Sequence, residues 1–273
     1  MTITSAQNEK IKNLLALQDK SRERKKQGLF VVEGRRELLH CIQAGYVPFT
    51  VFFCPDIISK DDRNEIEKTI EDQKAAGVCE KLPLVIDIPQ QIYDKVAYRG
   101  GTEGVIAQMH CRDLSLESLK LKENPLIVVL ESVEKPGNLG AVLRSADASG
   151  VDAVIVCDPL TDMYNPNLIR SSIGAIFTVP VATANSDEAI SWLKEKGAKI
   201  YTAQLQNSEW YYDTDMKGAT AIVMGTEATG LTDAWRNAAD AHIKIPMLGR
   251  LDSLNVSVSA AILMYEAVRQ RNS

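Results

Sequence analysis

The chain has 273 residues, of which 45% are hydrophobic and 25% are charged, and its formal net charge is −5. These proportions are typical of globular proteins, and the length allows one large domain or two smaller ones. No stretch approaches the roughly 20 apolar residues of a membrane span, and the N-terminus has no apolar segment of the kind found in signal peptides. We therefore expect a cytoplasmic protein that does not associate with membranes.

The cysteines and histidines exclude several kinds of chemistry. The five cysteines are odd in number, lie far apart and form no C-x-x-C pair, which predicts neither a disulfide framework nor a zinc site. The three histidines form no H-E-x-x-H motif, and no glycine-flanked serine marks a nucleophile elbow. We therefore expect no metal and set aside metal-dependent hydrolysis and catalytic triads.

Charge is unevenly distributed along the chain. Residues 1–36 contain nine lysines and arginines but only four aspartates and glutamates, so this end is basic within an acidic protein. The negative net charge argues mildly against a nucleic-acid partner, because phosphate binding uses basic surface. The basic end is consistent with such a partner or with an ordinary solvated helix face, and charge alone does not separate the two.

Hydrophobic spacing predicts a small α/β domain in residues 1–110. The expected helices cover 11–17, 36–44, 59–76 and 89–96, and the expected strands cover 29–32, 49–54, 84–88 and 104–109. Residues 111–124 are polar and end at Pro125, which indicates a linker to a second domain at 125–273.

Strands and helices alternate more strongly in the second domain, which predicts a parallel α/β sheet. The expected strands cover 126–130, 153–157, 177–182, 199–204, 221–224 and 242–245. The expected helices cover 139–148, 168–172, 187–196 and 255–271. The fold class is therefore α/β in both domains.

The first segment with distinctive chemistry, residues 138–150, opens a helix after a buried strand and carries Asn138 and Arg144. In open parallel sheets ligands bind beyond the carboxyl ends of the strands, where a helix N-terminus offers free amide groups to anions. Arg144 lies among apolar and small residues, where a guanidinium normally needs a partner. A salt bridge at the rim of the fold explains Arg144 at least as well as a functional role does.

The second segment, residues 224–231, follows an apolar strand and has Gly225 and Gly230 on either side of Glu227. Glycine lets a ligand approach the backbone closely, and a carboxylate can accept hydrogen bonds from hydroxyl groups. An ordinary tight turn between a strand and a helix has the same composition, so this segment alone is a weak indication.

The third segment, residues 245–261, contains a strand end, a glycine loop and a helix start. Ser253 and Asn255 are both suitable N-cap residues. The helix that follows is poor in charge, which predicts that it packs closely against another element. Capping explains part of this composition but not its run of small and polar residues.

Together the three segments resemble the signature motifs of the SpoU or TrmH branch of the SPOUT methyltransferases. The motifs are N-x-G-x-x-x-R-x-x-x-x-x-G, then G-x-E-x-x-G-L, then I-P-M followed by S-L-N-V-S-V-S-A-A. The resemblance covers the chain from about Pro125 onward. Residues 30–34 and 103–107 are similar to parts of the family's small substrate-binding domain, although Thr102 and Glu103 stand where members commonly carry glutamine or another polar residue.

The resemblance implies a fold and a cofactor. The family has a small N-terminal RNA-binding domain and a C-terminal parallel sheet with a trefoil knot, and two such chains pair as a homodimer. The cofactor is S-adenosylmethionine, and its binding residues correspond here to Gly225, Gly230, Ile245, Met247 and Leu254.

The resemblance also implies a reaction, the methylation of a ribose 2′-hydroxyl on RNA. The corresponding catalytic residues are Asn138, Arg144, Glu227, Ser253 and Asn255. A guanidinium does not readily give up its proton, so we expect Arg144 to activate the hydroxyl or hold the adjacent phosphate, with a phosphate oxygen or water completing the proton transfer. The basic N-terminal segment is most similar to members that act on 23S ribosomal RNA.

Other functions are less consistent with the sequence. The strand at 126–130 is not followed by G-x-G-x-x-G, as in dinucleotide-binding folds, and no G-x-x-x-x-G-K-[ST] motif occurs. The alternatives that stay open are a transfer-RNA 2′-O-methyltransferase and a non-catalytic RNA-binding or ribosome-assembly protein of the same fold. Arg144 and the intact cofactor segments favour an enzyme.

Overall fold

The computed structural model describes residues 1–98, 103–226 and 229–273, and the chain forms two compact units. The first unit contains Met1–Arg112 and Asp162–Thr178, and the second contains Asp113–Thr161 and Val179–Ser273. The segment Asp162–Thr178 therefore leaves the second half of the sequence to complete the first unit. From the sequence alone the segment would be assigned to the second domain, with its neighbours in the chain. A short helical segment carries no sequence pattern that shows which unit it packs against.

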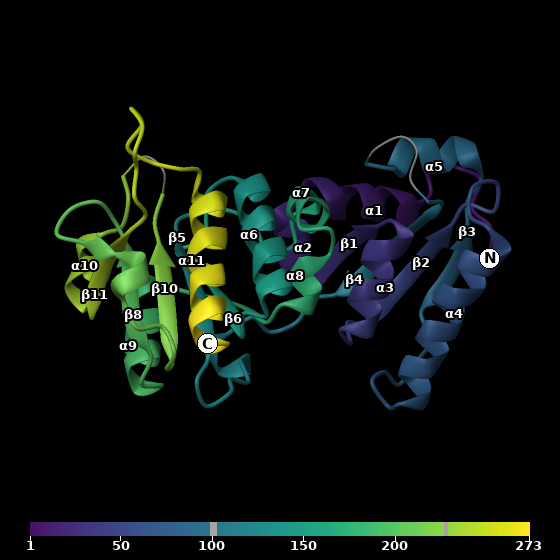
Figure 1. The fold of residues 1–273 in the computed structure, drawn as a ribbon. Helices are drawn as coiled ribbons and strands as arrows, with labels where there is room; N and C mark the ends of the chain where they lie inside the picture. The colour runs from purple at the N-terminus through teal and green to yellow at the C-terminus, as the bar shows by residue number, and fades with distance from the viewer. Residues whose placement is uncertain (99–102, 227–228) are drawn as a thin grey trace. The chain divides into compact units, whose positions relative to one another are not determined.

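The first unit contains a four-stranded mixed sheet in the order β1-β4-β2-β3 (Figure 1). Its helices and strands are α1 (Glu9–Asp19), α2 (Ser21–Gln27), β1 (Leu29–Glu33), α3 (Arg35–Gln43), β2 (Pro48–Phe53), α4 (Lys60–Ala75), β3 (Leu84–Asp87), α5 (Gln90–Val96), β4 (Val105–His110), α7 (Pro166–Ser171) and α8 (Ala175–Thr178). Strand β4 lies antiparallel between β1 and β2, so the β-α-β start that the sequence predicts is split by a later strand.

Buried contacts hold the segment Asp162–Thr178 within the first unit. Arg24 is only 3% exposed, and its Nε lies 2.6 Å from Asp162 Oδ2 while its Nη1 donates to the carbonyl oxygen of Leu17 at 2.6 Å. The ring of Phe30 stacks on Tyr164 with a centroid distance of 4.3 Å and lies 5.8 Å from the ring of Phe177. Burial of each such ring stabilises the unit by roughly 1.5–3 kcal/mol.

The second unit contains a seven-stranded sheet in the order β7-β6-β5-β10-β8-β11-β9, and every pair of neighbouring strands is parallel. Its elements are η1 (Leu116–Ser118), β5 (Leu126–Glu131), α6 (Pro136–Ser149), β6 (Ala153–Cys157), β7 (Val181–Ala184), α9 (Ser186–Glu195), β8 (Lys199–Ala203), β9 (Glu209–Trp210), η2 (Tyr211–Asp213), β10 (Thr220–Met224), α10 (Asp233–Ala238), β11 (Ala241–Lys244) and α11 (Val256–Arg271). The predicted α/β class with a parallel sheet is confirmed.

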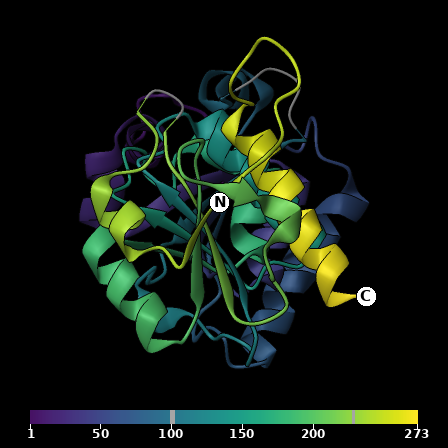
Figure 2. The same ribbon diagram turned by 60° about the vertical axis from the view of Figure 1, so that its left-hand side comes forward.

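Helices cover both faces of this sheet, so its strands β5, β6 and β10 are buried along their whole length. Figure 2 shows α9 and α10 on one face and α11 on the other. Ile127 and Val129 of β5 pack in the core under α9 and α10, together with Trp235. On the opposite face α11 packs along α6, where Ser149 Oγ lies 3.5 Å from Met264 Sδ.

Several local predictions were wrong, and each has a physical reason. The strand expected at 177–182 is instead the end of α8 followed by β7, because Pro180 cannot donate a ladder hydrogen bond and separates the two. Helix α6 begins at Pro136, a favoured first helical residue, and not at Leu139. The elements β9, η2 and α10 were not predicted, since two to six residues are too few to show a periodic pattern. None of the helices in the described residues is long and apolar enough to cross a membrane.

Candidate active site

The second unit has a cavity of about 420 Å³ at the carboxyl edge of its sheet, formed by the segments that follow β8, β10 and β11 and by the start of α11. Because all the strands are parallel, their carboxyl ends meet at this one edge. Six residues that the sequence singled out lie in its wall, namely Gly225, Gly230, Ile245, Met247, Ser253 and Leu254. Two of the three predicted segments therefore meet here.

In the segment after β10, the described residues Thr226 and Gly230 are joined by two backbone hydrogen bonds. Thr226 N donates to the Gly230 carbonyl at 3.3 Å, and Gly230 N donates to the Thr226 carbonyl at 3.1 Å. A Cβ atom on Gly225 would lie 2.3 Å from the carbonyl carbon of Gly230, so only glycine fits at this position. Glu227 lies outside the described residues.

The cavity wall combines apolar side chains with charged ones. Leu231, Val256 and Leu263 are apolar, whereas Arg236 and Lys244 are basic and Asp252 is acidic. S-adenosylmethionine has a flat adenine ring, a carboxylate, and positive ammonium and sulfonium groups. The apolar wall and backbone amides suit the ring, and the charged side chains suit the amino-acid part, so the residues present fit this cofactor.

Asn138 and Asn255 join the first predicted segment to the third. Asn255 caps α11 by accepting a hydrogen bond from Ser257 N at 3.0 Å, and its Nδ2 donates to Asn138 Oδ1 at 3.1 Å. Asn138 lies in the first turn of α6, which starts at Pro136. The pair therefore holds the first turns of α6 and α11 together, and neither side chain is among the described residues that form the cavity wall.

Arg144 lies on α6, exposed to solvent and outside the cavity wall. Its side chain has no hydrogen-bond or ion-pair partner within residues 1–98, 103–226 and 229–273. The salt bridge that the sequence left open is therefore not formed with any described residue. Ser253 is also exposed, and its Oγ lies 3.3 Å from Asp252 Oδ1.

Sequence reasoning missed part of the cavity. Residues 203–206 at the end of β8 belong to its wall, together with Lys244 and Asp252. They match no motif role, and the position of β8 between β10 and β11 cannot be read from chain order. The sequence instead expected residues 138–150 to complete the site.

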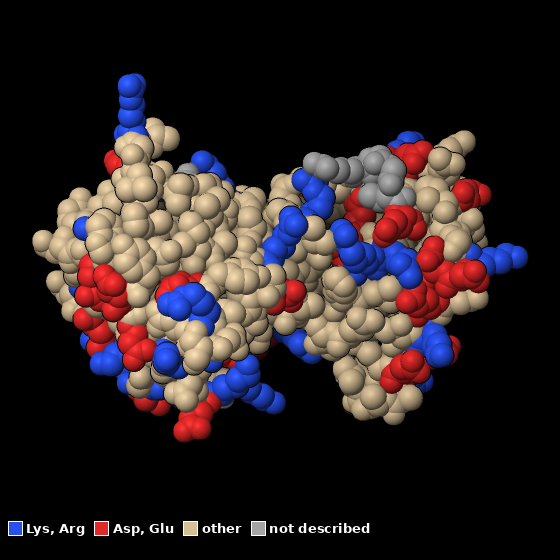
Figure 3. Space-filling model, in the orientation of Figure 1, with Lys and Arg blue, Asp and Glu red and all other residues tan. Residues whose placement is uncertain are grey.

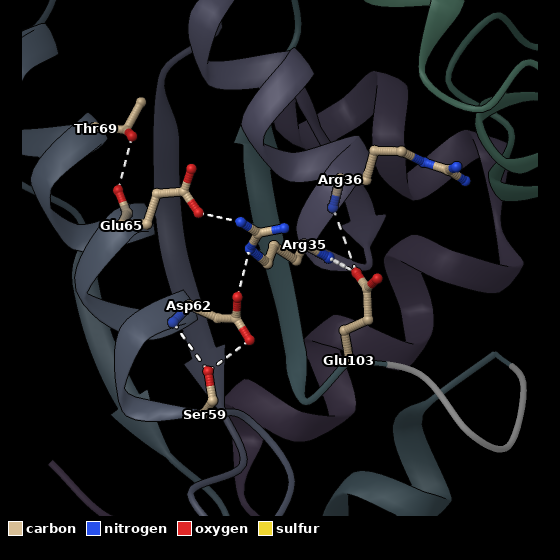
Figure 4. Close-up of polar contacts among 7 residues, drawn as sticks. All are labelled: Arg35, Arg36, Ser59, Asp62, Glu65, Thr69 and Glu103. Atoms are coloured by element: carbon tan, nitrogen blue, oxygen red, sulfur yellow. Dashed lines mark hydrogen bonds and ion pairs between the residues drawn. The ribbon is translucent and has the colours of Figure 1, made fainter.

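In the first unit, Glu103 stands directly before Gly104, where family members commonly carry glutamine or another polar residue. The carboxylate of Glu103 accepts hydrogen bonds from the backbone amides of Arg35 and Arg36 at the start of α3 (Figure 4). Glu103 thus caps a helix whose own N-cap residue has no side chain. The side chain of Arg35 is paired with Asp62 at 2.9 Å and with Glu65, and the hydrogen bond to Glu65 raises the pKa of Arg35.

Basic side chains on α2 are more available. Figure 3 shows basic side chains lying beside acidic ones on the visible face of the first unit, as the pairs at α3 and α4 illustrate. By contrast, four exposed basic residues at α2 have no ion-pair partner in the part of the chain that the structure describes, namely Lys20, Arg22, Lys25 and Lys26. The same described residues contain no group of three His, Cys, Asp or Glu side chains placed to hold a metal ion.

The chain matches two protein families. Residues 125–265 match the SpoU rRNA Methylase family, and residues 8–107 match the MRM3-like substrate binding domain. Curated relatives include the 23S rRNA (guanosine(2553)-2′-O)-methyltransferase RlmP of Bacillus subtilis, which is 29% identical over 96% of this chain and 97% of its own length. Another is the 23S rRNA (uridine(2479)-2′-O)-methyltransferase of Streptomyces viridochromogenes, 28% identical over 98% of this chain and 92% of its own.

Solved structures are similar over the whole length. A crystal structure of an RNA 2′-O ribose methyltransferase is 35% identical, covers 100% of both chains and has a TM-score of 0.80. The SpoU methyltransferase AviRb from Streptomyces viridochromogenes in complex with AdoMet is 27% identical, covers 97% of this chain and 99% of its own, and has a TM-score of 0.85. The chain therefore belongs to the SpoU rRNA methylase family and is an S-adenosylmethionine-dependent RNA 2′-O-ribose methyltransferase.

Proposed function

We propose that this enzyme methylates a ribose 2′-hydroxyl of 23S ribosomal RNA, with the cofactor in the second unit and the RNA held by the first. One observation carries the proposal: two of the three motif segments, residues 224–231 and 245–261, contribute to one cavity whose wall suits S-adenosylmethionine. The relatives named for 23S RNA match both units of this chain, which favours ribosomal over transfer RNA.

Cofactor binding is assigned to Gly225, Gly230, Ile245, Met247 and Leu254. The glycines bring backbone amides close to the ligand, and the apolar side chains form a slot in which a neutral aromatic base is held by shape. All five lie in the cavity wall. The bound cofactor supplies a methyl group already made electrophilic by the sulfonium, so placement and proton removal are left to the protein.

Arg144 is assigned to the substrate. An exposed guanidinium without a protein partner is free to make a bidentate pair with a phosphate next to the reacting ribose. In that position it orients the 2′-hydroxyl for in-line attack and lowers the energy of its developing negative charge. A phosphate oxygen or water accepts the proton, because a guanidinium that stays charged is no base.

The remaining polar residues are assigned to orientation. Asn138 and Asn255 hold the first turns of α6 and α11 together, which fixes the helix that carries Arg144. Ser253 contributes from the cavity wall. Glu227 keeps the role that the family resemblance implies, in hydrogen bonding near the cofactor.

We assign RNA binding to the first unit, whose residues 8–107 match a substrate-binding family. The exposed basic side chains of α2 can neutralise RNA phosphates, and the affinity should then fall as salt rises. The domain limits 1–110 and 125–273, with a linker at 111–124, belong to this proposal, with the segment Asp162–Thr178 of the second range packed in the first unit. The cytoplasm is the proposed location of the reaction.

A knotted chain and a homodimer are further parts of the proposal. Figure 3 shows an area with few charged side chains on the visible face of the second unit. Val258 and Tyr265 of α11 are exposed. Leu248 and Leu251, in the segment before α11, are exposed as well. Apolar groups of this number on a surface favour contact with a second copy. Analytical ultracentrifugation should give twice the mass of the chain. A monomer at the protein concentration used in the methylation assay would contradict the proposed homodimer.

The test is the transfer of labelled methyl groups from S-adenosylmethionine to separated large-subunit, small-subunit and transfer RNA, followed by nucleoside analysis. Undermethylated RNA from a strain lacking the enzyme serves as substrate. A 2′-O-methylated nucleoside from large-subunit RNA is the expected result. Label in transfer RNA alone would show that transfer RNA, and not ribosomal RNA, is the substrate. No label in any RNA, with cofactor binding also absent, would favour a non-catalytic RNA-binding role.

A further inference from the structure

We propose that Glu131 is a positioning residue for the cofactor: its buried carboxylate clamps Thr232, the residue that directly follows the turn of residues 225–231. Glu131 is the last residue of β5 and is 3% exposed. It lies outside the three motif segments and outside the cavity wall. Its effect on the reaction would therefore act through Thr232 and not through contact with a substrate.

Three hydrogen bonds reach this carboxylate, and two of them come from Thr232. Thr232 N donates to Glu131 Oε2 at 2.9 Å, and Thr232 Oγ1 donates to Glu131 Oε1 at 2.7 Å. The Ser186 hydroxyl lies 3.2 Å from Glu131 Oε1. Both ends of the carboxylate therefore bind the same residue, which fixes its backbone and its side chain at once.

Thr232 does not do what a threonine at its position ordinarily does. It is the N-cap of α10, where a threonine side chain normally accepts a hydrogen bond from the helix backbone. Here the side chain makes no capping hydrogen bond and is turned to Glu131. The helix loses a local stabilisation of about 1 kcal/mol, which indicates that the contact with Glu131 is the one that matters at this position.

Further hydrogen bonds surround Glu131 and Thr232. Trp235 Nε1, in the first turn of α10, donates to Ser186 Oγ at 2.9 Å, and the Ser186 hydroxyl lies 2.6 Å from Asp158 Oδ2. Ser186 is the first residue of α9. The ends of β5 and β6 and the starts of α9 and α10 thus share one buried polar network, in which Glu131 has little freedom to move.

The described residues on either side of positions 227 and 228 pack closely against one another. Gly225 packs against Gly230 with no room for a Cβ atom, and Thr226 and Gly230 exchange two backbone hydrogen bonds. Leu231, next to Thr232, is both buried in the core and part of the cavity wall. A shift of Thr232 would therefore move Leu231, and with it this part of the cavity wall.

Burying a carboxylate costs free energy, so an apolar side chain would serve a purely structural role at this position better than Glu131 does. Replacing a buried polar group and its partners with well-packed apolar residues is often neutral or stabilising. A charged acceptor, however, holds its donors with better-defined geometry than apolar packing does. Glu131 is thus suited to fix the position of Thr232 and of Leu231 beside it.

The experiment compares Glu131→Gln with Glu266→Gln by calorimetric titration of the full-length protein with S-adenosylmethionine and no RNA. Glu266 is a matched control in the same unit: it is 8% exposed, also accepts three hydrogen bonds, from Arg269 and Gln270, and lies outside the cavity wall. Glu131→Gln should raise the Kd about tenfold, and Glu266→Gln should leave it within about twofold. Equal values of Kd for Glu131→Gln and the wild type would overturn the proposal.

If Glu131→Gln does not fold, two substitutions of Thr232 test the same contact. Thr232→Val keeps the shape and the backbone hydrogen bond but removes the hydroxyl donor, whereas Thr232→Ser keeps both. Thr232→Val should raise the KM for the cofactor roughly threefold with kcat at saturation unchanged, and Thr232→Ser should match the wild type. A fall in kcat without a change in KM would overturn the proposal. Since the titration contains no RNA, its result does not depend on which RNA is methylated.

Discussion

The arginines at the start of α3 and in the middle of α6 have different surroundings. Arg35 is paired with Asp62 and Glu65, and Arg24 on α2 is buried against Asp162. Arg144, on a helix of the second unit, is exposed and has no partner among the described residues. A guanidinium already paired with carboxylates must lose those partners before it can bind a phosphate, whereas an unpaired one need not.

This comparison distinguishes arginines with a structural role from arginines that can bind a substrate. An arginine whose donors are used inside the protein stabilises the fold, and an arginine with free donors is available to a substrate. Sequence does not make this distinction, because Arg24, Arg35 and Arg144 are each followed or preceded by ordinary helical residues. Four experiments test this difference between paired and unpaired side chains.

The largest effect should come from Arg24→Ala. The substitution leaves Asp162 without its buried partner and removes a donor to the carbonyl of Leu17, so the free energy of unfolding should fall by about 3–5 kcal/mol. Urea unfolding followed by circular dichroism measures it. The half-exposed pair of Arg63 with Asp87 is the control, and Arg63→Ala should lose only about 1 kcal/mol. Equal losses would mean that burial does not set the value of these pairs.

Arg144→Ala should give the next largest effect, on catalysis alone. We expect kcat to fall at least about 100-fold, because phosphate placement and charge stabilisation are lost together. The Kd for S-adenosylmethionine and the stability should stay at wild-type values, since Arg144 is exposed and outside the cavity wall. Arg35→Ala is the matched control with paired donors. A similar loss of kcat in Arg144→Ala and Arg35→Ala would contradict the idea that only the unpaired arginine acts on the substrate.

A smaller effect is expected for the basic side chains on α2. Replacing Lys20, Arg22, Lys25 and Lys26 by glutamine should raise the KM for RNA about tenfold at moderate salt and make it less dependent on salt, because fewer phosphates are neutralised. The Kd for the cofactor should not change. Rates measured across a salt series provide the test, and an unchanged salt slope would remove α2 from the RNA-binding surface.

Most elements of the fold could be predicted from the sequence, because long periodic patterns report which face of a helix or strand is buried. The strand at 126–130 and the helix at 255–271 were placed correctly on that basis, and the structure has β5 at Leu126–Glu131 and α11 at Val256–Arg271. The return of Asp162–Thr178 to the first unit could not be predicted, since it depends on the Arg24 ion pair and on aromatic stacking between residues more than 100 positions apart.

The candidate site divides in the same way. Gly225 could be predicted because a close backbone approach requires glycine, and Gly230 because its positive φ of 68° favours glycine. Lys244 could not, because its place in the cavity follows from the order of β8, β10 and β11 in the sheet. Glu131 is hidden for a similar reason: its partner Thr232 is 101 residues away, and a single glutamate after an apolar strand has no pattern around it.

The smallest effect is a pH dependence at Glu266. The hydrogen bond from Arg269 lowers the pKa of Glu266, so the ionised form is favoured in the folded protein. A lowered pKa stabilises the fold above the unfolded value of about 4.3, and this contribution is lost as the pH falls through the folded value. The difference in unfolding free energy between the wild type and Glu266→Gln should therefore be constant above about pH 5.5 and shrink below about pH 4. Urea unfolding across that range measures it. Arg144→Gln, which removes an arginine with no carboxylate partner in the described residues, should differ from the wild type by the same small amount at every pH, and a shared pH dependence would contradict the contrast between paired and unpaired arginines.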